Sequence, residues 1–185
     1  VLVAGGAGAV GNAAIQLAAW AGATVITTVS GPEKAALAAA AGATHVVNYR
    51  TEDAAAAIRA IAPDGVDVIV EVAPTSNVGL DVAVAAPHAT IAIYANEAEP
   101  EMAVPVRANM MLNATYRFVM LYTVTPDELA NAVRATQAAV AAGAVRIGPE
   151  AGVPITRFRL EETASAHTAV QDGTVGKVLL DLVAE

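Results

Sequence analysis

Three glycines near the start of the chain, Gly6, Gly8 and Gly11, are spaced as G-x-G-x-x-G. The apolar run that begins at Val1 predicts a buried strand before them, and the pattern of Val10–Ala21 predicts a helix after them. In such a turn the N–H groups that open the helix can approach a diphosphate, because no Cβ stands in the way. A glycine-rich turn that only lets a helix pack on a sheet would show the same spacing. Because strand and helix flank the motif, we favour dinucleotide binding.

The tip of the second predicted strand, Thr24–Val29, carries no carboxylate. Sites specific for NAD place an acid there to accept the ribose hydroxyls, and that acid would repel a 2′-phosphate. Ser30 occupies the tip instead, with Lys34 nearby, and this pair favours NADP. Structural roles are open for both residues. Ser30 and Glu33 have the spacing of a capping box, and Lys34 could be a solvated side chain paired with Glu33 or a neighbour.

A polar stretch, Asn48–Asp53, follows the third predicted strand. In a doubly wound sheet this strand lies beside the second, so its carboxyl end lies on the adenosine side of the cofactor. Tyr49 could therefore lie over the adenine-ribose end and hydrogen-bond a phosphate, with Arg50 as a second cation. A tyrosine that covers the edge of the sheet is an equally good interpretation.

The sequence offers no residue that we assign to acid-base catalysis. Glu71 ends the fourth predicted strand and could relay a proton, although a carboxylate that caps a neighbouring helix is the better interpretation. No tyrosine has a lysine four residues later, which disfavours the short-chain dehydrogenase mechanism. A metal site is disfavoured because no histidine has a Cys or acidic partner at ligand spacing; the histidines are His45, His88 and His167.

The elements that must position these residues alternate regularly between strand and helix. This alternation predicts an α/β fold with a doubly wound parallel sheet, the Rossmann fold. The predicted strands begin near Val1, Thr24, His45, Val66 and Ala89, and the helices span Val10–Ala21, Pro32–Ala41, Asp53–Ala62 and Val78–Ala85.

Beyond the fifth strand, Ala89–Ile93, the pattern is less regular. A loop from Asn96 to Pro105 is followed by a predicted sixth strand, Leu112–Tyr122. Thr125, Pro126 and two acids predict the start of a helix that runs to Ala142. The tail is predicted as a strand, a helix and a last strand, over Ile155–Leu160, Glu161–Asp172 and Lys177–Leu182.

Composition bounds the class of protein. Hydrophobic residues make up 56% of the 185 residues and charged ones 15%, which predicts one globular domain with a real core. The formal charge of −8 disfavours nucleic acid and anionic membranes as partners. The absence of cysteine excludes disulfides and thiolate chemistry and is compatible with the cytoplasm, where we expect the protein. The chain opens on a core strand without Met, so we expect a piece of a longer protein.

Several motifs together resemble the medium-chain dehydrogenase/reductase family, and within it the zinc-independent quinone reductase, or zeta-crystallin-like, branch. The family's glycine turn ends Gly-x-Val-Gly, as Gly8-Ala9-Val10-Gly11 does here. The resemblance covers essentially the whole chain. Its other motifs match Thr28, Lys34, Gly42-Ala43, Asn48-Tyr49-Arg50, Ala166-His167 and Gly176-Lys177-Val178.

The resemblance implies hydride transfer from NADPH to a quinone or an activated enone, a small-molecule substrate. An enoyl-thioester reductase and a cofactor-binding module without turnover are the alternatives. Lys34 and Tyr49 would contact the 2′-phosphate, while Gly8, Ala9 and Val10 would line the pyrophosphate. Residues 1–150 would form the NADP-binding domain and residues 151–185 a segment that packs on a separate catalytic domain in the family. A homodimer is implied through the sixth strand, over Asn113–Leu121.

Three features depart from the family pattern. The N-terminal domain that forms most of the family's substrate pocket is missing from this sequence. Tyr94 stands at the tip of the fifth strand, where the family has glycine and where the nicotinamide amide meets the backbone. His88-Ala89 replaces the paired glycines that precede that strand.

Overall fold

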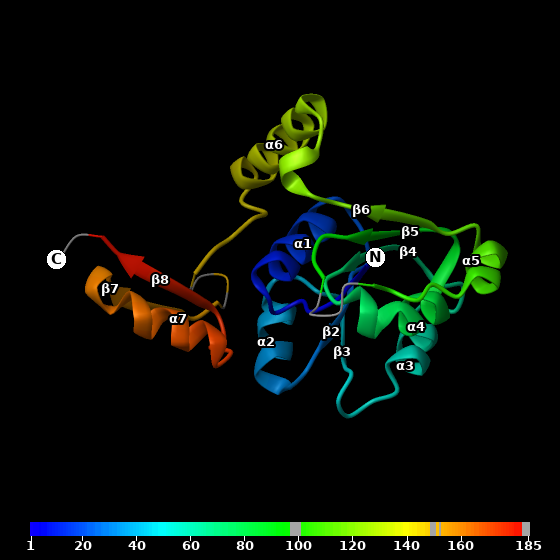
Figure 1. The fold of residues 1–185 in the computed structure, drawn as a ribbon, viewed down its shortest axis with the longest axis horizontal. Helices are drawn as coiled ribbons and strands as arrows, with labels where there is room; N and C mark the ends of the chain where they lie inside the picture. The colour runs from blue at the N-terminus through cyan, green and yellow to red at the C-terminus, as the bar shows by residue number, and fades with distance from the viewer. Residues whose placement is uncertain (97–100, 149–150, 152, 183–185) are drawn as a thin grey trace.

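The computed structural model describes residues 1–96, 101–148, 151 and 153–182, and it shows a parallel sheet covered by helices on both faces (Figure 1). Six strands pair in the order β3-β2-β1-β4-β5-β6, and every pairing is parallel. The order reverses between β1 and β4, as in the doubly wound fold that the sequence predicts. The strands of this sheet are β1 Leu2–Val3, β2 Ile26–Val29, β3 His45–Asn48, β4 Val66–Glu71, β5 Ala85–Ile93 and β6 Thr115–Phe118.

Helices connect the strands as right-handed crossovers require. The first four lie where the sequence predicts them, to within a few residues. The helices are α1 Ala9–Trp20, α2 Pro32–Ala40, α3 Ala54–Ile61, α4 Pro74–Val84, α5 Val106–Leu112, α6 Pro126–Ala141 and α7 Thr163–Gln171.

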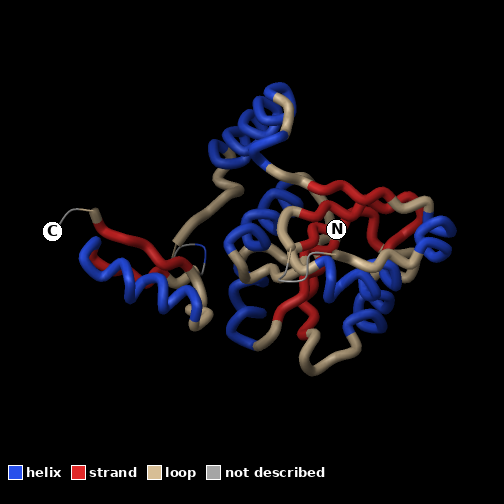
Figure 2. The backbone as a smooth tube through the Cα atoms, viewed as in Figure 1, coloured by secondary structure: helices blue, strands red, loops and turns tan. Residues whose placement is uncertain are grey.

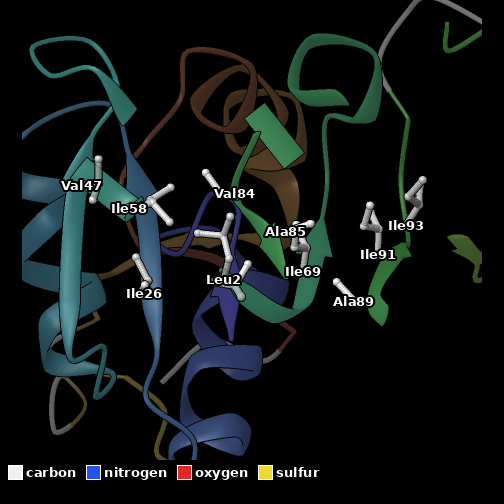
Figure 3. Packing of buried hydrophobic residues seen from close by; sticks show 11 residues of the cluster. Leu2, Ile26, Val47, Ile58, Ile69, Val84, Ala85, Ala89, Ile91 and Ile93 are labelled. Atoms are coloured by element: carbon white, nitrogen blue, oxygen red, sulfur yellow. The ribbon is translucent and has the colours of Figure 1, made fainter. Parts of the chain in front are cut away.

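Alternation along the short strands divides the core between the two faces of the sheet. Leu2 points into one apolar cluster and Val3 into the other. Figure 3 shows the larger cluster, in which Leu2, Ile69 and Ile91 pack together with residues of α3 and α4. The smaller cluster joins Val3 to Ile15 of α1 and to α2. Because both faces of the sheet are buried, the sequences of these strands are continuous apolar runs.

Two expectations for the second half of the chain are corrected. The sixth strand is Thr115–Phe118 and not Leu112–Tyr122, because helix α5 occupies its beginning and a short 3₁₀ segment, Leu121–Thr123, its end. Helix α5 was not expected at all. Asn113 ends it in the left-handed conformation, with φ 49°.

Helix α6 begins as predicted. Thr125 accepts a hydrogen bond from the Glu128 amide, and Glu128 in turn accepts one from the Thr125 amide, so the capping box is complete. In Figure 2 this helix extends away from the main sheet. Exposed Val133 and Val140 lie on it.

The tail forms a separate strand-helix-strand unit. Strands β7 Ile155–Arg159 and β8 Lys177–Asp181 pair in parallel with each other, and α7 lies between them in the chain. The three elements were predicted from the sequence, but their pairing as a second, two-stranded sheet was not.

His88, which departs from the glycine pattern of the resembling family, has an unusual backbone conformation. His88 has φ 66°, a conformation that glycine adopts at little cost. The strand pairing between β4 and β5 shifts register beside it, and Gly65 lies so close that a Cβ there would be 2.5 Å from the Ala86 nitrogen. Within strand β5, His88 thus has a backbone conformation that is less favourable for its side chain than for glycine.

Candidate cofactor site

A cavity of about 310 Å³ lies at the carboxyl ends of β1 and β2, beside the start of α1. Four of the residues predicted to bind the cofactor line it together: Gly8, Ser30, Lys34 and Tyr49. They come from three different strand-to-helix connections, which a parallel sheet brings to one edge. The remaining lining residues are Gly5, Ala7, Thr28, Val29, Gly173, Thr174, Val175 and Gly176.

The glycine turn is shaped by contacts that leave no room for side chains at two positions. A Cβ on Gly6 would overlap Thr27 Oγ1, and one on Gly11 would overlap the Gly5 carbonyl. Neither glycine lines the cavity. Their missing side chains let α1 lie close to the sheet. Gly5, which does line the cavity, has φ 65°.

Gly8 is the N-cap of α1, and no side chain caps this helix. Ala9 and Val10, its first two residues, are exposed. The N–H groups of a helix's first turn have no partner within the helix and carry the positive end of its dipole. This end of α1 is therefore able to hold an anion by main-chain groups alone.

The structure excludes the capping role for Ser30. Gly31, and not Ser30, is the N-cap of α2, and no side-chain hydrogen bond caps that helix. The Ser30–Glu33 capping box is therefore wrong. Ser30 lines the cavity, where a ligand can reach it.

Lys34 is half-buried in the first turn of α2 and faces the same cavity. Within the described ranges its ammonium forms no ion pair, neither with Glu33 nor with another acid. A cation near a helix N-terminus interacts unfavourably with the positive end of the helix dipole. The stability of the helix therefore does not explain a lysine at this position. Its position fits an anionic ligand.

Tyr49 follows β3 and lines the cavity with about half of its surface exposed. Arg50 is exposed and is not among the lining residues. The loop that carries both is held by its own polar groups: Asn48 N donates to Glu52 Oε1 at 2.8 Å, and Arg50 N donates to Asn48 Oδ1 at 3.1 Å.

The wall formed by Gly173–Gly176 is the part of the site that sequence reasoning missed. This loop joins α7 to β8, and Gly173 and Gly176 have φ 77° and 98°. A Gly-x-x-Gly pattern before a strand is a signal for such a turn. Nothing in the local pattern, however, shows that it lies against a cavity formed about 140 residues earlier.

A second cavity of about 540 Å³ lies farther along the same edge, at the ends of β5 and β6. Tyr94 lines it, together with Ile93, Phe118 and Met120. Burial, and secondarily the negative charge of Glu71, raises the pKa of the Tyr94 hydroxyl. Tyr94 thus remains protonated over the physiological range.

Glu71 has the capping role favoured from the sequence. It is fully buried, and its Oε1 accepts hydrogen bonds from the amides of Val72 and Ala73 and from Asn77 Nδ2. These groups lie at the start of α4. No cluster of His, Cys, Asp or Glu that could hold a metal ion occurs in the described part of the chain, and none of its helices has the length and hydrophobicity needed to cross a bilayer.

Comparison with known proteins identifies relatives over most of the chain. A family model described as "Zinc-binding dehydrogenase" matches residues 9–138. Quinone oxidoreductase of Sus scrofa is 29% identical over 185 residues, which are 97% of this chain and 54% of that protein.

Two solved structures are similar as well. The mycobacterial protein Rv1454c, complexed with NADPH, has a TM-score of 0.81 at 27% identity, with 97% of this chain and 55% of that chain covered. For 2-haloacrylate reductase the TM-score is 0.82 at 26% identity, with 99% and 57% covered. The chain spans about half the length of these relatives. It belongs to the zinc-binding dehydrogenase family of the medium-chain dehydrogenases/reductases, as a quinone oxidoreductase-like segment with the fold of their cofactor-binding domain.

Proposed function

We propose that this chain binds NADP and forms the cofactor-binding half of a zinc-independent oxidoreductase that transfers hydride from NADPH to a quinone or an activated enone. The observation that carries the proposal is Lys34, a half-buried cation without an acidic partner in the described structure, which shares a cavity with Ser30 and Tyr49. Among the described residues that line that cavity, none carries a carboxylate. A 2′-phosphate would find cationic and hydroxyl donors there and no repelling charge.

The cavity and the adjoining start of α1 together fit the adenosine and diphosphate part of the cofactor, although Ala9 and Val10 do not line the cavity itself. Gly8, Ala9 and Val10 would line the pyrophosphate at the start of α1, where only main-chain N–H groups are required. Ser30, Lys34 and Tyr49 would hold the 2′-phosphate. Gly6 and Gly11 would act indirectly, since their missing side chains let α1 lie close to the sheet.

The reversal of strand order between β1 and β4 separates the two ends of the proposed cofactor. With the adenosine phosphate on the β2 side, the nicotinamide would extend toward β4 and β5. The cavity lined by Tyr94 lies at that end and would receive the ring and the acceptor. When bound, NADPH supplies the hydride; the protein has to orient the ring and keep it in contact with the acceptor.

The acceptor class is proposed from the relatives. One relative is called a quinone oxidoreductase and another a 2-haloacrylate reductase, and both names denote electron-poor acceptors. An enoyl-thioester reductase is the alternative within the family. Since this chain spans about half of its relatives, a module that binds NADPH without turnover is the other alternative. Assay of quinone-dependent NADPH oxidation by this chain separates that module from an enzyme.

The first test is Lys34→Ala. A charge-assisted hydrogen bond contributes about 1.5 to 3 kcal/mol, so we expect NADPH affinity to fall about 10- to 100-fold. NADH, which lacks the 2′-phosphate, should bind the variant and the original chain about equally. Titration of cofactor fluorescence measures both affinities.

Arg50→Ala is the matched control, because it removes a cation from the neighbouring connection without touching the cavity wall. We expect less than about a threefold effect from this exposed, screened charge. Equal affinity of the original chain for NADPH and NADH would contradict the proposed phosphate site.

We further propose a homodimer through β6, over Asn113–Leu121. Strand β6 is an edge of the sheet, and an unpaired edge offers N–H and C=O groups to a second copy. Apolar side chains beside it are exposed; they are Phe118, Met120, Leu121 and Tyr122. We expect sedimentation at micromolar concentration to give twice the chain mass, while a monomer that persists at high concentration would exclude this interface.

A further inference from the structure

Gln16, in helix α1, and the main chain of Arg146 form a pair of hydrogen bonds that we call the clasp. Gln16 is 4% exposed, and its side-chain amide pairs with the main chain of Arg146, 130 residues away. Arg146 N donates to Gln16 Oε1 at 2.7 Å, and Gln16 Nε2 donates to Arg146 O at 3.2 Å. Gln16 Nε2 also donates to Asn12 Oδ1 at 2.9 Å. Both ends of the amide are therefore engaged, as a buried polar group requires.

The side chain of Arg146 forms a further hydrogen bond, to helix α2. Arg146 Nη2 donates to the Ala40 carbonyl at 2.8 Å. Helix α2 is the element that carries Lys34 in its first turn. Arg146 is thus linked to the helix of the glycine turn and to the helix of the phosphate-side cation.

Gly148, which follows Arg146 closely in the chain, begins a set of main-chain contacts that leads to the tail loop Gly173–Gly176. Gly148 O accepts from Val153 N at 3.0 Å, and Pro154 O accepts from Lys177 N at 2.8 Å. Gly176 packs directly on Pro154, since a Cβ on it would overlap the Pro154 carbonyl. This path ends at the tail loop, which lines the cavity together with Ser30 and Lys34.

We propose that Gln16 is a positioning residue for the cofactor: its clasp on Arg146 fixes the Gly173–Gly176 wall at the right distance from Lys34. This inference rests on the proposed function, because it takes the cavity to be the NADP site. Gln16 itself does not line the cavity, so its effect on binding must pass through the tail loop. A wall displaced by about 1 Å would leave the cofactor's donors and acceptors imperfectly paired.

The clasp can be opened without removing volume from the core. Methionine at position 16 has a similar length and no donor or acceptor, so it can pack in the same space. Arg146 is exposed, and water can take over the main-chain bonds that Gln16 releases. The buried Asn12 Oδ1 loses the bond from Gln16 Nε2, so we expect the melting temperature to fall by roughly 5 °C. Gln137→Met, on the exposed side of α6, is the matched control.

The experiment compares the original chain, Gln16→Met and Gln137→Met by NADPH titration and by hydrogen exchange of the main-chain amides. For Gln16→Met we expect about a tenfold loss of NADPH affinity, which corresponds to about 1.4 kcal/mol, and faster exchange of the 173–176 amides in the presence of NADPH. The control should match the original chain in both readouts.

Two results overturn the inference: unchanged NADPH affinity in Gln16→Met, whatever the exchange rates, or a loss of affinity without a change at residues 173–176. In either case the original chain still binds NADPH, and the proposed function stands. If the original chain does not bind NADPH, the proposed function fails and the inference fails with it.

Discussion

Replacing Asp81 by asparagine will remove most of the pH dependence of this domain's stability between pH 5 and pH 8. Asp81 is 1% exposed on α4, and neither of its carboxyl oxygens accepts a hydrogen bond within the described structure. Glu71, its buried neighbour, accepts bonds from two amides and from Asn77. The proton therefore resides on Asp81, which donates to Glu71.

Burial first, and then the charge of Glu71 and the hydrogen bond to it, raise the pKa of Asp81 to about 8. In the unfolded chain the pKa is near its usual value of about 3.9. The neutral form thus stabilises the fold fully below about pH 4, and this contribution is lost as the pH rises toward 8. The loss is on the order of 3 kcal/mol between pH 5 and pH 8.

Asparagine keeps the shape and can donate from Nδ2 to Glu71 at every pH. Urea unfolding at pH 5 and pH 8 should therefore show a free energy of unfolding that falls in the original chain and stays nearly level in Asp81→Asn. Asp64→Asn, at an exposed carboxylate, should follow the original chain. Parallel pH profiles for the original chain and Asp81→Asn would show that Asp81 is ionised in the folded state.

Alanine substitutions at Gly6 and Gly8 will separate effects on the free energy of unfolding from effects on NADPH affinity. At Gly6 a methyl group would overlap Thr27 Oγ1 and lie 2.7 Å from Ile15 Cδ1, both in the buried interior. Overpacking of this kind costs about 1 to 3 kcal/mol or more, so Gly6→Ala should lower the free energy of unfolding by at least that amount. Helix α1 would have to move away from the sheet.

At Gly8 the same change meets only the Gly5 carbonyl, at 3.3 Å, and the backbone φ of −71° suits alanine. The loss of an N-cap glycine costs less than about 1 kcal/mol. Gly8 lines the cavity, however, so the methyl group would stand where the pyrophosphate approaches the amides. We expect NADPH affinity to fall about tenfold or more in Gly8→Ala, with stability nearly retained. Denaturant unfolding and cofactor titration of both variants measure the two effects, and tight NADPH binding by Gly8→Ala would refute this assignment.

The sequence was sufficient where the relevant signals are local. Apolar strands and alanine-rich helices alternate through residue 93, and this alternation alone predicts the sheet, because each βα unit must bury two faces. Sheet geometry then brings Gly8, Ser30, Lys34 and Tyr49 to one edge. The start of α6 was predictable for the same reason, since Thr125 and Glu128 cap it within four residues.

Prediction failed where tertiary contacts override local pattern. The stretch before β6 alternates like a strand, but Leu112 packs with the cluster under α4 as the last residue of helix α5. Ser30 has the spacing of a cap, yet the N-cap of α2 is one residue later, at Gly31, and the helix begins at Pro32. The tail loop Gly173–Gly176 lines the cavity, and Gln16 pairs with Arg146 across 130 residues. No local signal in the sequence reports either of these long-range contacts.

We expect NADPH to place its diphosphate at the start of α1 and its 2′-phosphate beside Lys34. The decisive experiment is titration of the isotope-labelled chain with NADPH, followed through its main-chain amide resonances. We predict the largest shifts at Gly8, Ala9 and Val10 and at residues 30–34, with the latter set reduced when NADH replaces NADPH. Binding that leaves these amides unchanged and shifts resonances elsewhere would contradict the assignment of the site.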